Sequence, residues 1–197
     1  TVRSYIPAFL QGKRTFKVEA KRSDKSFPLS SPEIAAEIGK TYEEEEANCA
    51  QNGFHCVEEP IRVLDWYPKG RWCMVNAEDI HEDGTDKIAC KKMTILKELT
   101  QQQLLAYEAA WMLKHPDRAY SSKVEKERGK AEKGGTVIVR GKNPMAKGEA
   151  GSMLLLVQEG KRTKNILRIT AIEVNEDEYM PGIWYDAEGR AHEKIRT

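Results

Sequence analysis

The sequence predicts an α+β protein, with a mixed N-terminal sheet carrying short helices and one longer helix, followed by a smaller antiparallel β unit. Three observations favour this class. An amphipathic helical pattern covers residues 101–114, and strand-like runs lie on both sides of it. A polar, lysine-rich and glycine-ended segment then separates two groups of strands. We therefore expect an N-terminal domain at residues 1–120, a linker at 121–135 and the β unit at 136–197.

The first third of the chain predicts short strands joined by turns and loops. Residues 1–20 read as one or two strands around Gly12-Lys13, and a loop rich in Ser, Pro and Lys follows. Next comes a short helix at residues 33–38 that Gly39 ends. Asn52-Gly53 then predicts a turn into a strand at residues 54–57.

The middle of the chain predicts two helices and two strands. Pro60 begins a helix that residues 68–70 end, and residues 71–77 alternate as a strand does. Residues 88–99 fit a strand followed by a connection or a partly helical segment, and Thr, Ile and Met favour a strand in the first half. In the long helix after Thr100, the apolar face comprises Leu104, Leu105, Ala109, Trp111 and Met112.

The last third of the chain predicts an antiparallel β unit. Strand-like runs occupy residues 136–140, 152–158, 166–174 and 183–185, and Gly, Asn, Asp and Pro separate them.

Composition argues against several function classes. Lys and Arg total 32 against 31 Asp and Glu, so the charge balance gives no general reason to expect nucleic-acid binding. No apolar run is long enough to cross a bilayer, and the N-terminal segment lacks the apolar core of a secretory signal. The four cysteines show no C-x-x-C spacing, so we expect reduced thiols in a cytoplasmic protein with no membrane association.

The segment at residues 52–67, NGFHCVEEPIRVLDWY, is the best candidate for a functional site. A glycine turn followed by a strand and a helix places His55 near a strand end, where its ring can exchange hydrogen bonds with a ligand. The alternative is that His55 is a half-buried structural histidine. The nearby aromatic residues Trp66, Tyr67 and Trp72 either stack on a base or nicotinamide ring or pack the helix against the next strand.

A zinc site, a cysteine nucleophile and a basic nucleic-acid-binding segment have weaker support in the sequence. The cysteines lie too far apart for a structural zinc site, and no spacing selects a partner that would activate Cys56 as a nucleophile. Cys56 and Cys73 are therefore expected as small core residues. The lysine-rich segment interleaves acids with bases and lacks aromatic residues, which favours a solvated spacer. Arg140, Lys142 and Lys147 form at most a modest basic loop.

Residues 39–78 contain a distinctive pattern, which comprises Gly39, Lys40, Tyr42, Cys49, Asn52, Gly53, Phe54, His55, Pro60 and Tyr67. This pattern resembles that of an uncharacterised domain family of phages, prophages and bacteria. The end of the chain, AKGEAGSMLLLVQEG and PGIWYDAEGR, is similar to the C-terminal segment that such phage proteins carry after glycine-rich β-roll repeats. At most one repeat rung is expected here, around TVIVRGKNPMAKG.

A looser likeness links the order of elements to ADP-ribosyltransferase-like domains. It implies an NAD pocket lined by Arg3 or Tyr5 together with His55 and Tyr67. The ligand-binding candidates of the chain are therefore Arg3, Tyr5, His55, Trp66 and Tyr67. Catalytic candidates are His55 and an acid, with Glu98 and Glu78 placed only by rough position. Cys56 stands where such domains carry Ser or Thr.

Two functions follow as expectations. The first is a phage-associated accessory or interaction protein in the bacterial or host cytoplasm, binding a host factor, a phage protein or a nucleotide and forming an oligomer through its C-terminal β unit. The second is an NAD-using enzyme of the ADP-ribosyltransferase type with its site around His55. Only the second implies a cofactor, and neither implies a metal.

Overall fold

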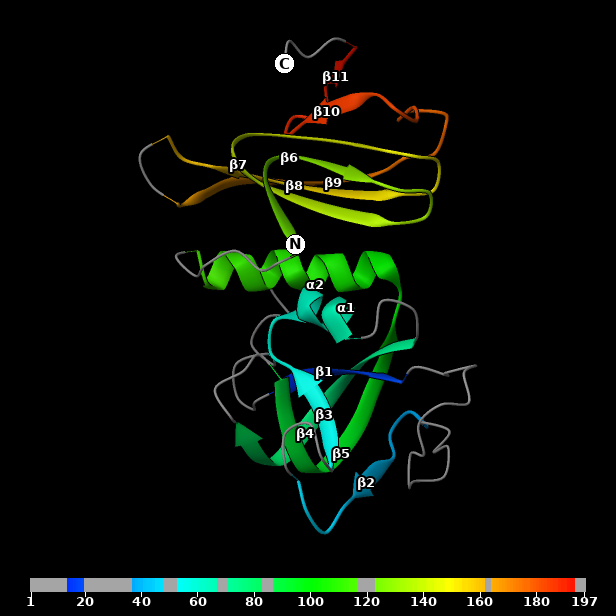
Figure 1. Ribbon diagram of the computed structural model, residues 1–197, viewed down its shortest axis with the longest axis vertical. Coiled ribbons are helices and arrows are strands. Elements are labelled where there is room, and N and C mark those ends of the chain that lie inside the picture. Colours follow the sequence, from blue (N-terminus) through cyan, green and yellow to red (C-terminus); the bar gives the residue numbers. More distant parts are fainter. Residues whose placement is uncertain are drawn as a thin grey trace. The chain divides into compact units, whose positions relative to one another are not determined.

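The computed structural model describes residues 14–19, 37–47, 53–66, 71–82, 87–116, 123–161 and 164–193. They form two compact units, residues 1–108 and 109–197, which we call the N-terminal and C-terminal units. Most described residues lie in strands, so the protein is richer in β structure than the predicted α+β class (Figure 1). The predicted elements at residues 1–10 and 20–36 lie outside the described residues, as does most of the helix at 33–38.

The N-terminal unit is a small antiparallel sheet that closes on itself. Its strands are β1 (Arg14–Glu19), β2 (Thr41–Glu43), β3 (Phe54–Val57), β4 (Arg71–Glu82) and β5 (Lys87–Leu99). β5 pairs with β2 and β3 along one edge and with β4 along the other, and β1 pairs with both β3 and β4. The circuit β1–β3–β5–β4 is therefore complete, which removes the free edges of these four strands.

The interior of this circuit holds an apolar cluster that contains three thiols. Its buried members are Phe54, Cys56, Cys73, Val75, Ala77, Ile88, Cys90, Met93 and Ile95. A second cluster packs the outside of the sheet against the helices and joins Val57, Val63, Leu99 and Leu104, with Trp72 and Tyr107 beside them. Residues 88–99 are strand throughout, which decides the alternatives that the sequence left open for that segment.

The helices of the N-terminal unit begin where the sequence predicts. Pro60 starts a 3-10 turn, η2 (Pro60–Arg62), which continues as α1 (Val63–Trp66). The Ile61 N–H donates to Glu108 Oε2 at 3.0 Å, so a fully buried carboxylate from α2 (Gln101–Lys114) holds the start of that turn. Thr100 and Gln103 form a reciprocal capping box at the start of α2, with bonds of 3.2 and 3.1 Å.

The C-terminal unit differs most from the prediction. It comprises β6 (Val124–Ala131), β7 (Thr136–Gly148), β8 (Met153–Glu159), β9 (Ile166–Glu173), β10 (Trp184–Asp186) and β11 (Ala191–His192). β6 with β7 and β7 with β8 are parallel pairs, so the prediction of an antiparallel unit is wrong for these strands, although β9, β10 and β11 pair antiparallel. The residues predicted as a linker include strand β6.

The parallel strands coil around one core in stacked layers. Thr136 pairs with Met153, and Gly129 pairs with Ala146, each seventeen residues further along the chain. Only a chain that bends round its core returns beside itself after so short a connection. Three layers, from β6, β7 and β8, are therefore stacked where the sequence predicted at most one rung. The residues inside include Ala131, Val137, Val139, Ala146, Leu154 and Leu156.

A buried ion pair and a glutamate at a bend fix this coil. Arg140, 2% exposed, donates to Glu159 Oε1 at 2.8 Å and to the carbonyls of Pro116 and Lys164. Glu127 has a φ of 64° and accepts the Lys142 and Asn143 N–H groups at 2.9 and 3.0 Å. This bend takes up the register shift between β6 and β7.

Candidate functional site

His55 lies on β3, next to the turn that the sequence predicts. Gly53 has a φ of 79°, and a Cβ there would come within 2.8 Å of Ala47, so only glycine fits this turn. His55 is half-buried, whereas its neighbours Phe54 and Cys56 are buried in the interior cluster. Alternation along the strand therefore puts the imidazole on the outer face of the sheet. His55 and His81 flank the fully buried Ala89 in one cross-strand row.

The other residues of the predicted NAD pocket are not placed beside His55. Arg3, Tyr5 and Tyr67 lie outside the described residues, and Trp66 is described only by its backbone at the end of α1. Their convergence on His55 stays a prediction. Trp72, which the sequence left open between stacking and packing, packs against the cluster of Val57 and Leu104.

The two candidate acids lie at different distances from His55 along the sheet. Glu98 pairs with Cys73, nine residues along β5 from the Ala89 that faces His55, or about 30 Å of strand. Glu78 is exposed and lies three residues from His81 on β4. A direct partnership between His55 and Glu98 is therefore not supported by this register.

Three of the four cysteines are core residues, as predicted for two of them. Cys56, Cys73 and Cys90 are buried, and Cys56 Sγ lies 3.8 Å from the Ile88 carbonyl oxygen. Cys49 lies outside the described residues. Within the described ranges, no three His, Cys, Asp or Glu side chains are grouped so that they could hold a metal ion. The same ranges contain no helix with the length and apolarity needed to cross a membrane.

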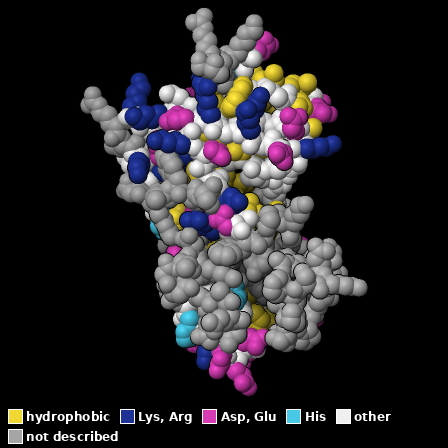
Figure 2. Space-filling model, viewed as in Figure 1, with side chains coloured by type: hydrophobic (Ala, Val, Ile, Leu, Met, Phe, Trp, Pro, Cys, Tyr) yellow, Lys and Arg dark blue, Asp and Glu magenta, His cyan; other side chains and the backbone are white. Residues whose placement is uncertain are grey.

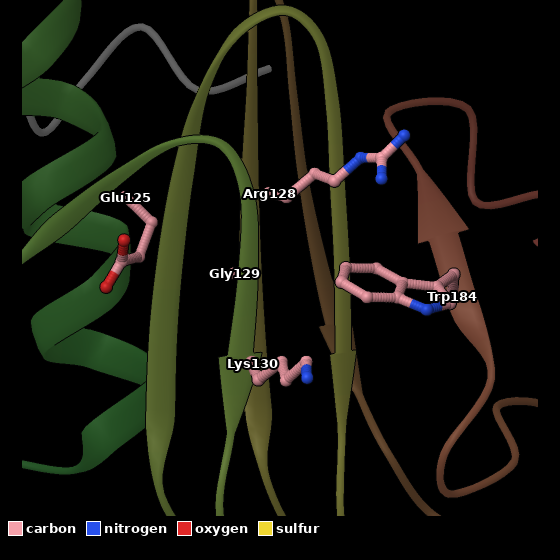
Figure 3. A pocket seen from close by; sticks show the side chains of 5 residues that line it. All are labelled: Glu125, Arg128, Gly129, Lys130 and Trp184. Carbon is pink, nitrogen blue, oxygen red and sulfur yellow. The ribbon is translucent and has the colours of Figure 1, made fainter. Parts of the chain in front are cut away.

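A shallow surface depression lies on the C-terminal unit, lined by Glu125, Arg128, Gly129, Lys130 and Trp184. Figure 3 shows the Arg128 and Lys130 side chains extending from β6 toward the Trp184 ring on β10, while Glu125 projects away from them. The Lys147 ammonium lies 5.3 Å from the centre of the Trp184 ring, a cation–π contact.

Strand register explains why these side chains share one face. Lys130 pairs with Lys147, and the β7–β10 register puts Trp184 opposite Lys147 and then His192 opposite Trp184. Residues directly opposite in a ladder point to the same side. The neighbouring row on this side carries Arg128, Met145, Asp186 and Arg190. We call these two rows the basic face.

The inner side of the same strands is packed tightly, which holds the basic face outward. Gly129 pairs with Ala146 and Ala146 with Tyr185, and all three are buried. A Cβ on Gly129 would approach Val137 and Val139 to 2.6 and 2.7 Å, so glycine lets β6 lie directly on the core. Arg128 and Lys130, on either side of Gly129, are consequently exposed.

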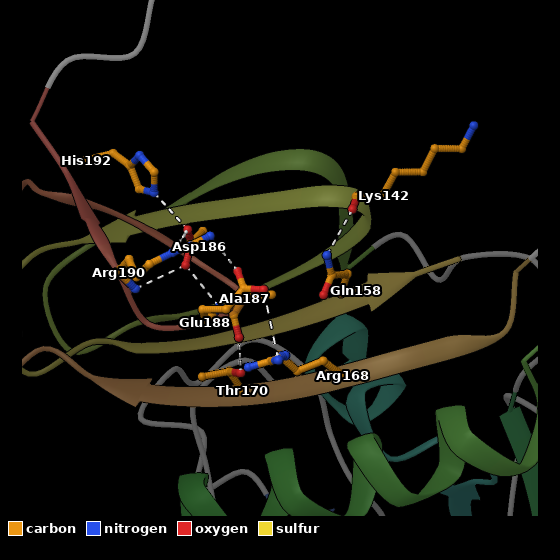
Figure 4. A network of polar contacts seen from close by, with 9 residues as sticks. All are labelled: Lys142, Gln158, Arg168, Thr170, Asp186, Ala187, Glu188, Arg190 and His192. Atoms are coloured by element: carbon orange, nitrogen blue, oxygen red, sulfur yellow. Dashed lines mark hydrogen bonds and ion pairs between the residues drawn. The ribbon is translucent and has the colours of Figure 1, made fainter. Parts of the chain in front are cut away.

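Asp186 is the carboxylate within the basic face, and its neighbours balance its charge (Figure 4). Asp186 Oδ2 lies 2.8 Å from His192 Nε2 and accepts Arg190 Nε at 2.9 Å, while Oδ1 accepts the Glu188 and Arg190 N–H groups. Burial alone would raise the pKa of Asp186, but the hydrogen bonds from His192 and Arg190 outweigh it and hold the pKa below its ordinary value. Asp186 likewise raises the pKa of Arg190.

Sequence reasoning missed this face because its parts are far apart along the chain. The lysine-rich segment lacks aromatic residues of its own, but the fold places Trp184, more than fifty residues later, beside it. The available signal was the exposed, alternating pattern of β6 around a buried Gly129.

Comparison with known proteins finds a family match over part of the chain. Residues 11–107 match the model of a domain of unknown function, DUF7666. The DUF7666 match includes the NGFH segment and ends within α2, so the expected membership of an uncharacterised domain family is supported over that range. The basic face lies outside the DUF7666 region.

A short stretch of 29 residues is 66% identical to a probable tRNA sulfurtransferase of Alkaliphilus metalliredigens (strain QYMF). The stretch covers 15% of this chain and 7% of that protein, so it carries no functional assignment. No solved structure matches the chain.

Proposed function

We propose that this protein is an accessory binding protein whose C-terminal unit holds a phosphate-bearing ligand on the basic face. The observation that carries the proposal is the arrangement of Arg128, Lys130 and Lys147 around the Trp184 ring. Guanidinium and ammonium groups are the side chains that bind phosphate, and an aromatic ring gives a planar organic group a surface for stacking.

The distribution of charge along the chain supports this proposal. Residues 109–197 carry 17 Lys and Arg against 13 Asp and Glu, whereas residues 1–108 carry 15 against 18. On the side shown in Figure 2, Lys and Arg side chains are spread over the C-terminal unit, with Asp and Glu side chains between them. The overall charge of +1 therefore conceals a basic unit and an acidic one, and the basic unit is the one that attracts anions.

An accessory role also fits the likeness to phage and prophage proteins. In this proposal the C-terminal unit holds the ligand, and the DUF7666 region serves contacts with a host or phage protein. The exposed positions of Arg128 and Lys130 suit a ligand that is held at the surface.

Equilibrium binding to a panel of phosphate compounds tests the proposal. The panel comprises inorganic polyphosphate, ATP, NAD and a short oligonucleotide, each measured by calorimetry at low salt with the full chain. We expect at least one of them to bind, and we expect Arg128→Glu with Lys130→Glu to weaken that binding at least tenfold. Lys161→Glu is the matched control, since Lys161 is an exposed lysine of the same unit outside the basic face. Failure of every compound to bind would refute the proposal.

The same panel tests the NAD-using alternative, which the element order around His55 motivates. Under that alternative NAD binds, His55→Ala abolishes its binding, and the charge reversal on β6 leaves it unchanged. If the basic face holds the ligand, His55→Ala leaves ligand binding unchanged.

A further inference from the structure

We infer that the ligand of the basic face is a single-stranded nucleic acid, with a base stacked on Trp184 and successive phosphates held by cations on both sides of it. This inference rests on the proposed function and specifies its ligand.

The spread of the cations favours a polymer over a mononucleotide. Neighbouring strands lie about 4.8 Å apart, so the row from Lys130 through Lys147 and Trp184 to His192 extends about 14 Å. Arg128 and Arg190 lie in the adjacent row, about 7 Å along the strands. One phosphate group reaches one or two of these positions. A chain of phosphates contacts cations on both sides of the ring.

The ring and the shape of the surface favour a single strand over a duplex. Stacking on Trp184 requires an exposed base face, which a duplex hides within its own stack. The depression beside Trp184 is shallow and open, so a flexible strand can lie along it. The Lys147 ammonium contacts the Trp184 ring, so it lies where it can bind the phosphate of a nucleotide whose base stacks on that ring.

The acidic groups around the face do not cancel its charge. Asp186 is bonded to Arg190 and His192, and Glu188 is bonded to Arg190 at 3.0 Å. Glu125 lines the depression but projects away from Arg128 and Lys130 (Figure 3). Arg128, Lys130 and Lys147 therefore supply the attraction for phosphate. Arg190 adds to that attraction while it stays bonded to Asp186 and Glu188.

The test compares a labelled oligothymidylate with inorganic polyphosphate of matched charge, using fluorescence anisotropy and the full chain. We expect tighter binding of the oligonucleotide. We expect Trp184→Leu to weaken oligonucleotide binding about tenfold or more while leaving polyphosphate binding unchanged, and Trp184→Phe to retain most of the affinity. Lys130→Glu should weaken both ligands, and circular dichroism confirms that each variant is folded.

Two outcomes would overturn the inference. One is equal binding of oligonucleotide and polyphosphate that Trp184→Leu does not change, which leaves an electrostatic anion site and the proposed function intact. The other is duplex binding as tight as that of the single strand. Comparison of oligouridylate with oligodeoxyuridylate, which differ only in the 2′-OH, then distinguishes RNA from DNA, and preference for either supports a single-stranded ligand. Absence of any binding would instead refute the proposed function itself.

Discussion

The Asp186 carboxylate makes the stability of the C-terminal hairpin depend on pH. This carboxylate holds Arg190 and His192 together with two backbone N–H groups of the turn between β10 and β11. A group whose pKa is lowered by folding stabilises the folded state above its unfolded pKa, which is about 4 for Asp. That stabilisation is lost as the pH falls through the lowered native pKa.

We therefore predict that Asp186→Asn destabilises the protein at neutral pH, and that the difference from the native chain shrinks as the pH falls below about 4 and is lost below the lowered native pKa of Asp186. The loss at neutral pH should be at most about 1 kcal/mol, because the Arg190 partner is well exposed and its ion pair is screened by water. Urea unfolding of both chains across a pH series measures the difference. A constant difference down to pH 2 would show that the charge of Asp186 plays no part.

For single residues, the sequence indicates which side chains are unusual, but it does not indicate as well which residues lie beside them in the fold. Gly53 could be predicted to occupy a turn because its neighbour Asn52 and the strand after it are local signals. The relation of His55 to Glu98 could not be predicted, because it depends on the register of β3 and β5, which local composition does not specify.

At the scale of elements, the pairing of β6 with β7 depends on Glu127. Its carboxylate replaces a backbone partner for two N–H groups of β7, so the shorter β6 can stay in register with the longer β7. A Cβ on Gly141 would lie 2.5 Å from the Glu127 carboxyl carbon, so that carboxylate also requires glycine beneath it.

We predict that Glu127→Ala lowers the free energy of unfolding by about 1–2 kcal/mol, because two N–H groups lose a charged acceptor. Glu125→Ala, two residues earlier on the same strand and exposed, is the matched control and should change stability by less than about 0.5 kcal/mol. Thermal and urea unfolding measure both. Equal effects of the two substitutions would contradict the role assigned to Glu127.

The sequence predicted elements correctly where local residues determine them, and it failed where the pairing of distant strands determines the structure. The helix at residues 101–114 is confirmed with its Thr100 cap, because both the cap and the 3.6-residue pattern lie within one short segment. β6 was mistaken for a linker because it carries the exposed charged residues Glu125, Lys126, Arg128 and Lys130. Parallel pairing was missed because short connections usually join antiparallel strands. Parallel strands with short connections form only where the chain coils around its core, as β6 and β7 do.

At the scale of the whole molecule, the separation of charge predicts how binding responds to salt. If single-stranded nucleic acid binds the basic face, displacement of counterions by Arg128, Lys130, Lys147 and Arg190 should give a slope of about −2 to −3 in a plot of log affinity against log salt. Anisotropy titrations at several salt concentrations measure this slope. Lys130→Glu should reduce its magnitude by about one, whereas Lys161→Glu should leave it unchanged.

Stacked layers are offset by 14 residues from Val124 to Lys126 of β6 and by 17 residues elsewhere, and these offsets set a rule for changes of chain length in the C-terminal unit. An insertion of one full circuit adds a layer whose inward positions continue the columns of Val137, Val139, Leu154 and Leu156. An insertion of one residue reverses which side chains face the core for the rest of the layer, unless a bend such as that at Glu127 absorbs it. Length in this part of the molecule should therefore change in whole layers, each of which carries its own outward row of side chains for a ligand to contact.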